Sequence, residues 1–472
     1  MGCTAFGWWS SPVIALFSDK TYEASWVEFL SLTKRVISMK VKVFTILCTA
    51  LMYCFSAGAL HARYIHVATW GSAAGSPYAT LEQGIQAANA SPGVDDIRVY
   101  SGNYTLPVSG VQITEECKIT AHSNATVNVD IPGPFGHLTV CNGDAQFNGI
   151  EFRCSAGGYG QTAVVGTGSD ARIHFMDCRF SNFPRTPVQG RGCKRVELKF
   201  CTFSDNSGVN GGAMRAVGVE EVFVEDCQFS KNSTVGDGGA ICLVDCTIAT
   251  IYRSWLIDNV ALNRGGTVFV DNVLDLEMRN DVVSGNLSLQ EGGGIRFQNT
   301  GTSPLLAGSL PIIRMDVVNC TIFDNLSMSS GGGLSIQPTV VIPRCYTRVV
   351  NSILWNNKAN ARLKVFAQSD MPLDHVDHCC IEGWGVVASY TGTDVIALNP
   401  QLNAKGELMF YSPCINQGDR SLFPSAGFAM DIAQNYRVVG TELDMGAHEY
   451  QADLFGSEVD KLDVEGLPRC VD

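Results

Sequence analysis

Two arginines, a phenylalanine and an aspartate stand at related positions in the middle of the chain. Arg215, Phe269 and Arg296 occupy one position in three copies of a repeated sequence, and Asp271 follows Phe269 by two residues. A guanidinium group pairs with carboxylates, and an aromatic ring offers a flat apolar surface on which a sugar ring can stack. We therefore take these four residues as glycan-binding candidates. The alternative is an ordinary solvated sheet surface, on which single exposed residues are normal.

The same positions give weaker support for catalysis. A lyase that acts on an acidic polysaccharide needs a base and a cation that neutralises the uronate carboxylate, whereas a glycoside hydrolase needs paired carboxyl groups at a set separation. Arg215 and Arg296 lie three repeats apart, or about 14 Å at the spacing of stacked strands. That separation is too large for joint action on one sugar ring, so no catalytic residue is assigned.

Acidic side chains suggest a metal ion elsewhere. Glu197, Glu225, Glu277 and Asp316 are predicted to lie on the outer face of a second sheet. Hard oxygen ligands suit Ca²⁺, so a calcium site is one prediction for this face. The alternative is that these carboxylates interact only with solvent. No other cofactor is expected.

The densest group of ligand-type residues stands in the segment PLDHVDHCC. It contains Asp374, His375, Asp377 and His378. The two histidines would share one face if the segment were helical, and a strand would separate them. A metal site here is therefore a weaker hypothesis, since metal ligands need a supporting shell of hydrogen bonds.

A repeated unit positions all of these residues. The motif F-x-x-N, in which Leu, Val or Ile can replace Phe, recurs at intervals of 26 or 27 residues and then of 39 and 32. A glycine pair follows each of the first five copies. The asparagines are Asn206, Asn232, Asn259, Asn286, Asn325 and Asn357. The glycine pairs begin at Gly211, Gly238, Gly265, Gly292 and Gly331.

Alternation within the unit predicts short strands. After each glycine pair, apolar residues occupy every second position, as in a strand with one buried face. With two further strands before each Asn, the stacked units predict an all-β fold, a right-handed parallel β-helix with three short strands per coil. The asparagines would form a buried ladder, and the glycines would allow positive φ or close backbone approach. The units are too short for β-propeller blades.

Cysteines recur two residues before the Phe position, as at Cys201 and Cys227. Cysteines on stacked strands could form disulfides. The alternative is that they are small buried apolar side chains. Signal-peptide removal would take Cys3, Cys48 and Cys54 from the 18 cysteines and leave an odd number, which favours the alternative.

The ends of the chain differ from the repeat. Residues 39–59 combine a basic start, an apolar run and a small-residue cleavage site, which predicts a secretory signal peptide; a retained membrane anchor is the alternative. Residues 1–38 are interpreted as an upstream extension. We expect the β-helix, with an N-terminal helical cap, over residues 60–357, C-terminal coils and a cap over 358–451, and a tail over 452–472.

The charge of the chain limits the classes of partner that we expect it to bind. The formal net charge is −13, and no long block of Lys and Arg is present. Such a chain repels phosphate backbones, so we expect no nucleic acid. The expected partner is a polysaccharide or a cell-surface glycan or protein, and no transmembrane segment is expected after signal cleavage.

The sequence resembles two groups of proteins. The pairs FSDN with GGAM and FSKN with GGAI resemble the repeats of chlamydial polymorphic outer-membrane proteins, which are surface adhesins. The segments YIHVATWGS, NSILWNN, HCCIEGWG and VVGTELDMGAHEYQ resemble, in order, bacterial choice-of-anchor Q β-helix proteins. This second resemblance implies a pectin-lyase-like fold in a secreted, cell-surface or outer-membrane-associated protein, and it implies no reaction.

Together these features predict an exported, non-catalytic protein that acts in adhesion or glycan interaction. The alternative is a pectate-lyase-like polysaccharide lyase acting on an acidic polysaccharide. Dispersed candidate residues, rather than one compact cluster, favour the first.

Overall fold

The computed structural model describes residues 63–69, 78–123, 125–133, 136–154, 161–301, 313–337, 345–360, 364–386, 388–422, 430–439 and 442–451. The chain divides into two compact units, Met1–His61 and Ala62–Asp472, and every described residue lies in the second. The predicted upstream extension, signal peptide and tail therefore lie outside the described residues.

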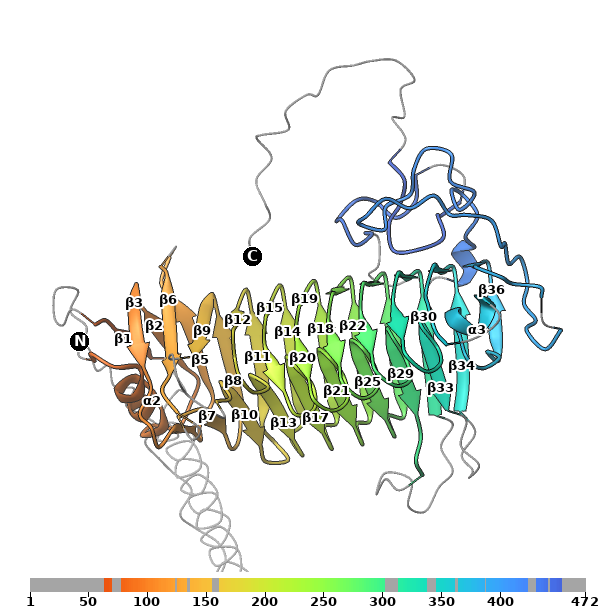
Figure 1. Ribbon diagram of the computed structural model, residues 1–472. Coiled ribbons are helices and arrows are strands. Elements are labelled where there is room, and N and C mark those ends of the chain that lie inside the picture. The colour runs from red at the N-terminus through yellow and green to blue at the C-terminus, as the bar shows by residue number, and fades with distance from the viewer. Residues whose placement is uncertain are drawn as a thin grey trace, which may run out of the picture. The chain divides into compact units, whose positions relative to one another are not determined.

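Short parallel strands stack into three long sheets, with one strand per sheet in each coil (Figure 1). Sheet A contains β1 (Tyr64–Val67), β2 (Asp95–Val99), β5 (Cys117–Ala121), β8 (Asp144–Asn148), β11 (Arg172–Met176), β14 (Arg195–Lys199), β18 (Glu221–Glu225), β22 (Ile248–Tyr252), β26 (Asp275–Arg279), β30 (Ile313–Val318), β34 (Cys345–Val350) and β36 (His375–Asp377). Sheet B contains β3 (Gly102–Thr105), β6 (Val127–Ile131), β9 (Ile150–Cys154), β12 (Arg179–Ser181), β15 (Thr202–Ser204), β19 (Gln228–Ser230), β23 (Trp255–Ile257), β27 (Val282–Ser284), β31 (Thr321–Phe323), β35 (Ile353–Trp355) and β37 (Cys380–Ile381).

The remaining strands complete each coil. Sheet C contains β4 (Val111–Ile113), β7 (Leu138–Val140), β10 (Val164–Thr167), β13 (Val188–Arg191), β17 (Met214–Val217), β21 (Ile241–Val244), β25 (Val268–Asp271), β29 (Ile295–Gln298) and β33 (Leu334–Gln337). Sheet D contains β16 (Ser207–Gly208), β20 (Ser233–Thr234), β24 (Val260–Ala261), β28 (Leu287–Ser288) and β32 (Leu326–Ser327). The predicted β-helix with three strands per coil is confirmed, and sheet D is an addition that the sequence did not indicate.

A helix covers the first coil. α2 (Leu81–Asn89) begins with a capping box, in which the Gln83 backbone N–H donates to the Thr80 hydroxyl at 3.2 Å. Its buried side chains include Leu81, Ile85 and Ala88, which lie on one face of the helix. Among the described residues, the other helices are the short α3 (Lys364–Gln368) and the 3-10 helix η3 (Arg420–Leu422).

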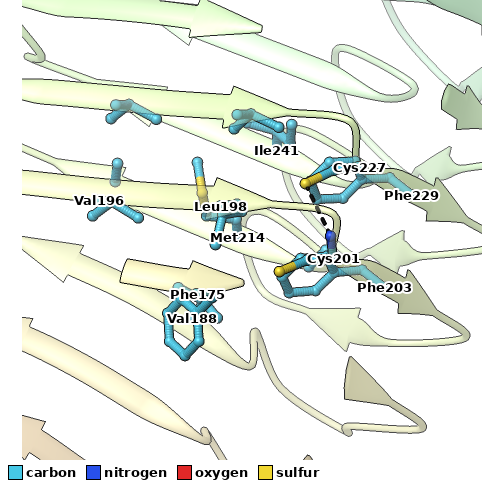
Figure 2. Packing of buried hydrophobic residues seen from close by; sticks show 14 of the residues in the cluster. Phe175, Val188, Val196, Leu198, Cys201, Phe203, Met214, Cys227, Phe229 and Ile241 are labelled. Atoms are coloured by element: carbon cyan, nitrogen blue, oxygen red, sulfur yellow. Dashed lines mark hydrogen bonds between the residues drawn. The ribbon is translucent and has the colours of Figure 1, made fainter. Parts of the chain in front are cut away.

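The core is a stack of like residues in register. Phe203 pairs with Phe229 across sheet B, and their rings stack at 4.9 Å between centroids. Phe180 continues the stack at 4.6 Å from Phe203. Figure 2 shows the Phe203 and Phe229 rings together with aliphatic core residues from sheets A and C, such as Leu198 and Ile241. The repeated Phe therefore fills the same position of the core in successive coils.

The asparagines form a continuous buried ladder. In each step, the backbone N–H and the side-chain amide of one Asn donate to the side-chain oxygen of the next, as from Asn232 to Asn259 at 2.9 and 3.0 Å. The same pattern joins all six asparagines. The ladder ends at α3, where Asn357 donates to Gln368 at 2.6 Å and Gln368 donates to Glu382 at 3.1 Å. The repeat did not predict that Gln368 and Glu382 end the ladder.

The cysteine column is a second ladder of backbone acceptors. Cys201 N–H donates to the Cys227 sulfur at 3.4 Å (Figure 2), Cys227 N–H to Ser254 at 3.2 Å, and Ser254 N–H to Asp281 at 2.8 Å. Every cysteine among the described residues is a free thiol. The column therefore needs a small side chain that accepts a hydrogen bond, which explains why Ser and Asp replace Cys.

Asp281 makes this ladder sensitive to pH. It is fully buried, and the desolvation holds its pKa well above the ordinary value of 3.8. Between about pH 4 and this raised pKa, the unfolded chain releases the proton that the folded chain retains, so the free energy of unfolding falls as the pH rises. We expect Asp281→Ser, the residue type of the column at Ser254, to gain stability over the wild type by about 1.4 kcal/mol per pH unit across this window.

Urea unfolding at pH 4 and pH 7 measures this gain. Asp170→Ser, at an exposed position, provides the matched control and should show a smaller change with pH. An equal difference between Asp281→Ser and the wild type at both pH values would contradict the prediction.

The two glycines of each pair have different roles. Gly265, the first of its pair, has φ +66°, a left-handed conformation that glycine adopts without strain. At Gly266, the second, an added Cβ would lie 1.9 Å from the carbonyl oxygen of Gly293 in the next coil. Positive φ and close approach, predicted as alternatives, therefore occur together at one corner.

A C-terminal segment, residues 388–451, packs against the later coils (Figure 1). Its Ile432 and Ala447 pack on Val282 and Phe323, on the outer face of sheet B. Stacked asparagines at the corner between sheets A and B, all with left-handed φ, donate their amides to its backbone carbonyls. The donors are Asn280, Asn319 and Asn351, and the acceptors are Met430, Asp444 and Asp419. The later part of sheet B is thus covered.

Candidate functional site

The face predicted to bind glycans is covered. Phe269 is only 3% exposed, and the guanidinium of Arg264 lies 4.9 Å from its ring centroid. The corner segments that carry the glycine pairs fold against this face: an added Cβ on Gly292 would lie 3.0 Å from the Cβ of Arg296. The prediction that Phe269 is a sugar-stacking surface is therefore wrong.

The polar candidates on sheet C serve an internal network. Arg296, 6% exposed, donates to Ser335 at 2.6 Å, and Ser335 donates to Asp370 at 2.6 Å. Desolvation by this burial lowers the pKa of Arg296. Asp271 accepts from Gln298 at 3.1 Å. The two candidates therefore bond to side chains of neighbouring coils.

Of the two candidate arginines on sheet C, Arg215 is the less buried. It lies half-buried on β17 and pairs in register with Cys242 of the next coil. Three coils separate it from Arg296, as the repeat predicted. The structure thus keeps the two arginines apart.

The acidic candidates on sheet A are paired with cations. A calcium ion on this face would have to displace these partners, so the pairing does not favour the Ca²⁺ prediction, which stays a prediction. The pairs are Glu197 with Lys199 at 2.9 Å, Glu225 with Arg253 at 3.0 Å, Glu277 with Arg279, and Asp316 with Arg348 at 3.8 Å.

The outer face of sheet A carries an aromatic patch, which we define as Met176, Arg195, Lys199, Phe200 and Phe223. The Phe223 ring lies between two cations, with the Lys199 ammonium 5.3 Å and the Arg195 guanidinium 5.8 Å from its centroid. Met176 pairs in register with Lys199 and is largely exposed. Along the central strands β14 and β18, the outward side chains of this face are half-buried.

Glu197 orders the cations beside the patch. His174 lies 2.5 Å from it, and the hydrogen bond from His174, followed by those of Lys199 and the charge of Arg195, lowers the pKa of Glu197 to about 2. The carboxylate thus stays ionised at any physiological pH. It holds Lys199 and Arg195 around the Phe223 ring.

Phe200 has an unusual conformation for its residue type. It stands at the corner between β14 and β15 with φ +53° and 52% of its surface exposed. Other coils place Asp226, Arg253, Asn280 or Asn351 at this position, and the short Asp and Asn side chains tolerate left-handed φ better than a phenylalanine. Alternation of apolar residues does not indicate a left-handed corner, so Phe200 was not predicted as a site residue.

The histidine-rich segment divides as β36 ends. Asp377 and His378 lie together, with 2.8 Å between the Asp377 Oδ1 and His378 Nδ1 atoms, and Asp394 joins them from a later turn. Asp374 instead accepts from the Thr347 backbone at 3.0 Å. His375 lies outside the cluster of three.

Stacked parallel sheets with a buried asparagine ladder define a right-handed parallel β-helix protein. Over residues 137–310, the sequence is similar to the family described as a right-handed beta helix region. No curated protein matches the sequence. In the part of the chain that the structure describes, no helix is long and apolar enough to span a bilayer. The fold is compatible with surface adhesion and with polysaccharide-related roles.

Proposed function

We propose that the protein is an exported, non-catalytic β-helix protein that binds a surface or extracellular glycan through the aromatic patch. The observation that carries the proposal is Phe200. Its left-handed backbone costs about 1–2 kcal/mol, and its exposed ring recovers little of this by burial. A ring held at such a cost on the surface is suited to a ligand, and the apolar face of a sugar ring stacks on aromatic side chains.

The composition of the patch supports a sugar ligand. Phe200 directly follows Lys199 in the chain, and the Lys199 ammonium lies 5.3 Å from the centroid of the Phe223 ring. Cations and carboxylates beside an aromatic ring supply hydrogen-bond donors and acceptors for hydroxyl groups. Parallel strands repeat these positions about every 4.8 Å, so an extended glycan would cross several coils.

The export and adhesion parts of the proposal rest on the sequence. They are supported by the signal-peptide pattern of residues 39–59 and by the resemblance to choice-of-anchor Q proteins and to chlamydial surface adhesins. An exported β-helix with an open, charged face fits adhesion to a glycan-bearing surface.

Phe200→Asn separates binding from folding. Asparagine tolerates the left-handed conformation, so we expect the variant to be as stable as the wild type or more stable by up to about 1 kcal/mol. We also expect it to bind the glycan about tenfold more weakly, because the variant lacks the aromatic ring on which the sugar stacks. Binding of the full chain to a glycan array, with and without Ca²⁺, and urea unfolding measure the two effects.

Two further variants sharpen this test. Phe223→Ala should weaken binding similarly, whereas Tyr436→Ala, which removes an exposed aromatic residue from the C-terminal segment, should not. Unchanged binding in Phe200→Asn and Phe223→Ala would overturn the proposed site. Release of unsaturated uronate products from pectate or alginate, followed by absorbance, would instead identify a polysaccharide lyase.

A further inference from the structure

A cluster of metal-ligand side chains lies at the last corners of the β-helix. One donor atom from each of Asp377, His378 and Asp394 lies within 4.8 Å of the other two. His378 is central: its Nδ1 atom lies 2.8 Å from Asp377, and its Nε2 atom lies 3.7 Å from Asp394. An imidazole between two carboxylates is a mixed N/O donor set of the kind that divalent transition metals bind.

The stacking of the coils creates this cluster. Thr393 forms a bridge with Asp377, so Asp394 stacks next to His378, and both have left-handed φ, at +49° and +46°. They continue the same corner column in which Asn351 stands one coil earlier. In that coil the corner residue holds the C-terminal segment through an amide, whereas here the column presents an imidazole and a carboxylate.

The cluster opens into a cavity of about 450 Å³. Its walls come from His378 and Asp394 and from the C-terminal segment, including Asn416, Gln417 and Glu442. An ion bound by the three side chains would keep positions open toward this cavity, and Glu442 would add a further carboxylate to its surroundings. The Asp394 side chain is 67% exposed, so it can rotate and bring its carboxylate closer to Asp377 and His378.

We propose that Asp377, His378 and Asp394 bind a divalent transition-metal ion of the Zn²⁺ class. The ion would be bound by one nitrogen of His378 and by one oxygen from each carboxylate. It would also join β36, through Asp377, to the turn that carries Asp394. The proposal does not depend on the glycan site.

Zinc titration of the chelator-treated full chain tests the proposal. We expect the wild type to bind Zn²⁺ calorimetrically and to melt at a higher temperature as the Zn²⁺ concentration rises. His378→Asn, in which asparagine keeps the left-handed φ, and Asp394→Asn should each lower the Zn²⁺ affinity at least tenfold. His122→Asn, which changes a histidine in an early coil many strands away from β36, should leave the affinity unchanged.

Free cysteines are the competing ligands, and Co²⁺ distinguishes them. Cobalt bound by thiolates gives intense near-ultraviolet charge-transfer bands, whereas nitrogen and oxygen ligands give only weak visible bands. Equal Zn²⁺ affinity in the wild type and in Asp394→Asn, or thiolate bands from the tightest Co²⁺ site, would overturn the proposal. Asp394→Asn decides the question even if His378→Asn fails to fold, because Asp394 is exposed.

Discussion

Gly266→Ala is expected to destabilise the protein by about 4 kcal/mol or more, which is at the extreme for a single methyl group. The added Cβ would lie 1.9 Å from the Gly293 carbonyl oxygen and 2.8–2.9 Å from backbone atoms of Leu287. All of these atoms belong to the backbone of the next coil, so no side chain can rotate away. Relief requires the coils to separate, which breaks the hydrogen bonds between them.

A series of glycine variants isolates this steric cost. At Gly133 nothing lies within 4 Å of an added Cβ, so Gly133→Ala should change stability little. At Gly192 the space is also open, but φ is +61°, so Gly192→Ala should cost only the conformational strain of about 1 kcal/mol. Urea unfolding, followed by circular dichroism, ranks the three. A Gly266→Ala cost no larger than that of Gly192→Ala would refute the close packing of the corners.

Asn259→Ala is expected to cost about 3–5 kcal/mol because it breaks the ladder at its middle. The Asn259 side chain is fully buried; it donates to Phe229 O at 3.0 Å and to Asn286 at 3.1 Å, and it accepts from Asn232 at 2.9 and 3.0 Å. Alanine leaves these groups buried without partners, and each unsatisfied group costs about 1–3 kcal/mol.

Asn360→Ala is the matched control for the ladder. Asn360 is an exposed asparagine near the end of the β-helix, so its loss should change the free energy of unfolding by less than about 0.5 kcal/mol. The same urea experiment measures both variants. If Asn259→Ala were as mild as Asn360→Ala, the ladder would not be a main source of stability.

The repeat made the coils predictable from the sequence. Asn259 and Gly266 recur at fixed offsets, and a residue that recurs in every coil stacks on its own copies. The alternation after each glycine pair also identified the buried side of β25 correctly. The repeat alone was therefore enough to predict the asparagine ladder, the glycine corners and the order of the three main strands in each coil.

The candidate site was less predictable because it depends on what lies outside each coil. Alternation placed Phe269 on the outer side of its strand, but it could not reveal that a corner segment folds over that side. It also could not bring Asp394 to His378, because residues 388–451 lack the repeat. The sequence does contain one indication of the covered coils. An Asn precedes the small residue of the cysteine column at Asn280, Asn319 and Asn351, and these asparagines hold the C-terminal segment.

The contacts of the C-terminal segment span much larger sequence separations than the contacts between neighbouring coils. In the asparagine ladder, neighbouring coils are joined by residues 26 to 39 positions apart, as in the steps that begin at Asn206 and Asn286. The segment instead reaches back over 150 residues from Met430 to Asn280 and over 208 from Gln434 to Asp226. Near-neighbour contacts form quickly, whereas distant ones must wait for the intervening chain. The coils can thus assemble one after another during synthesis, and the closing of the segment over them is the last and slowest event.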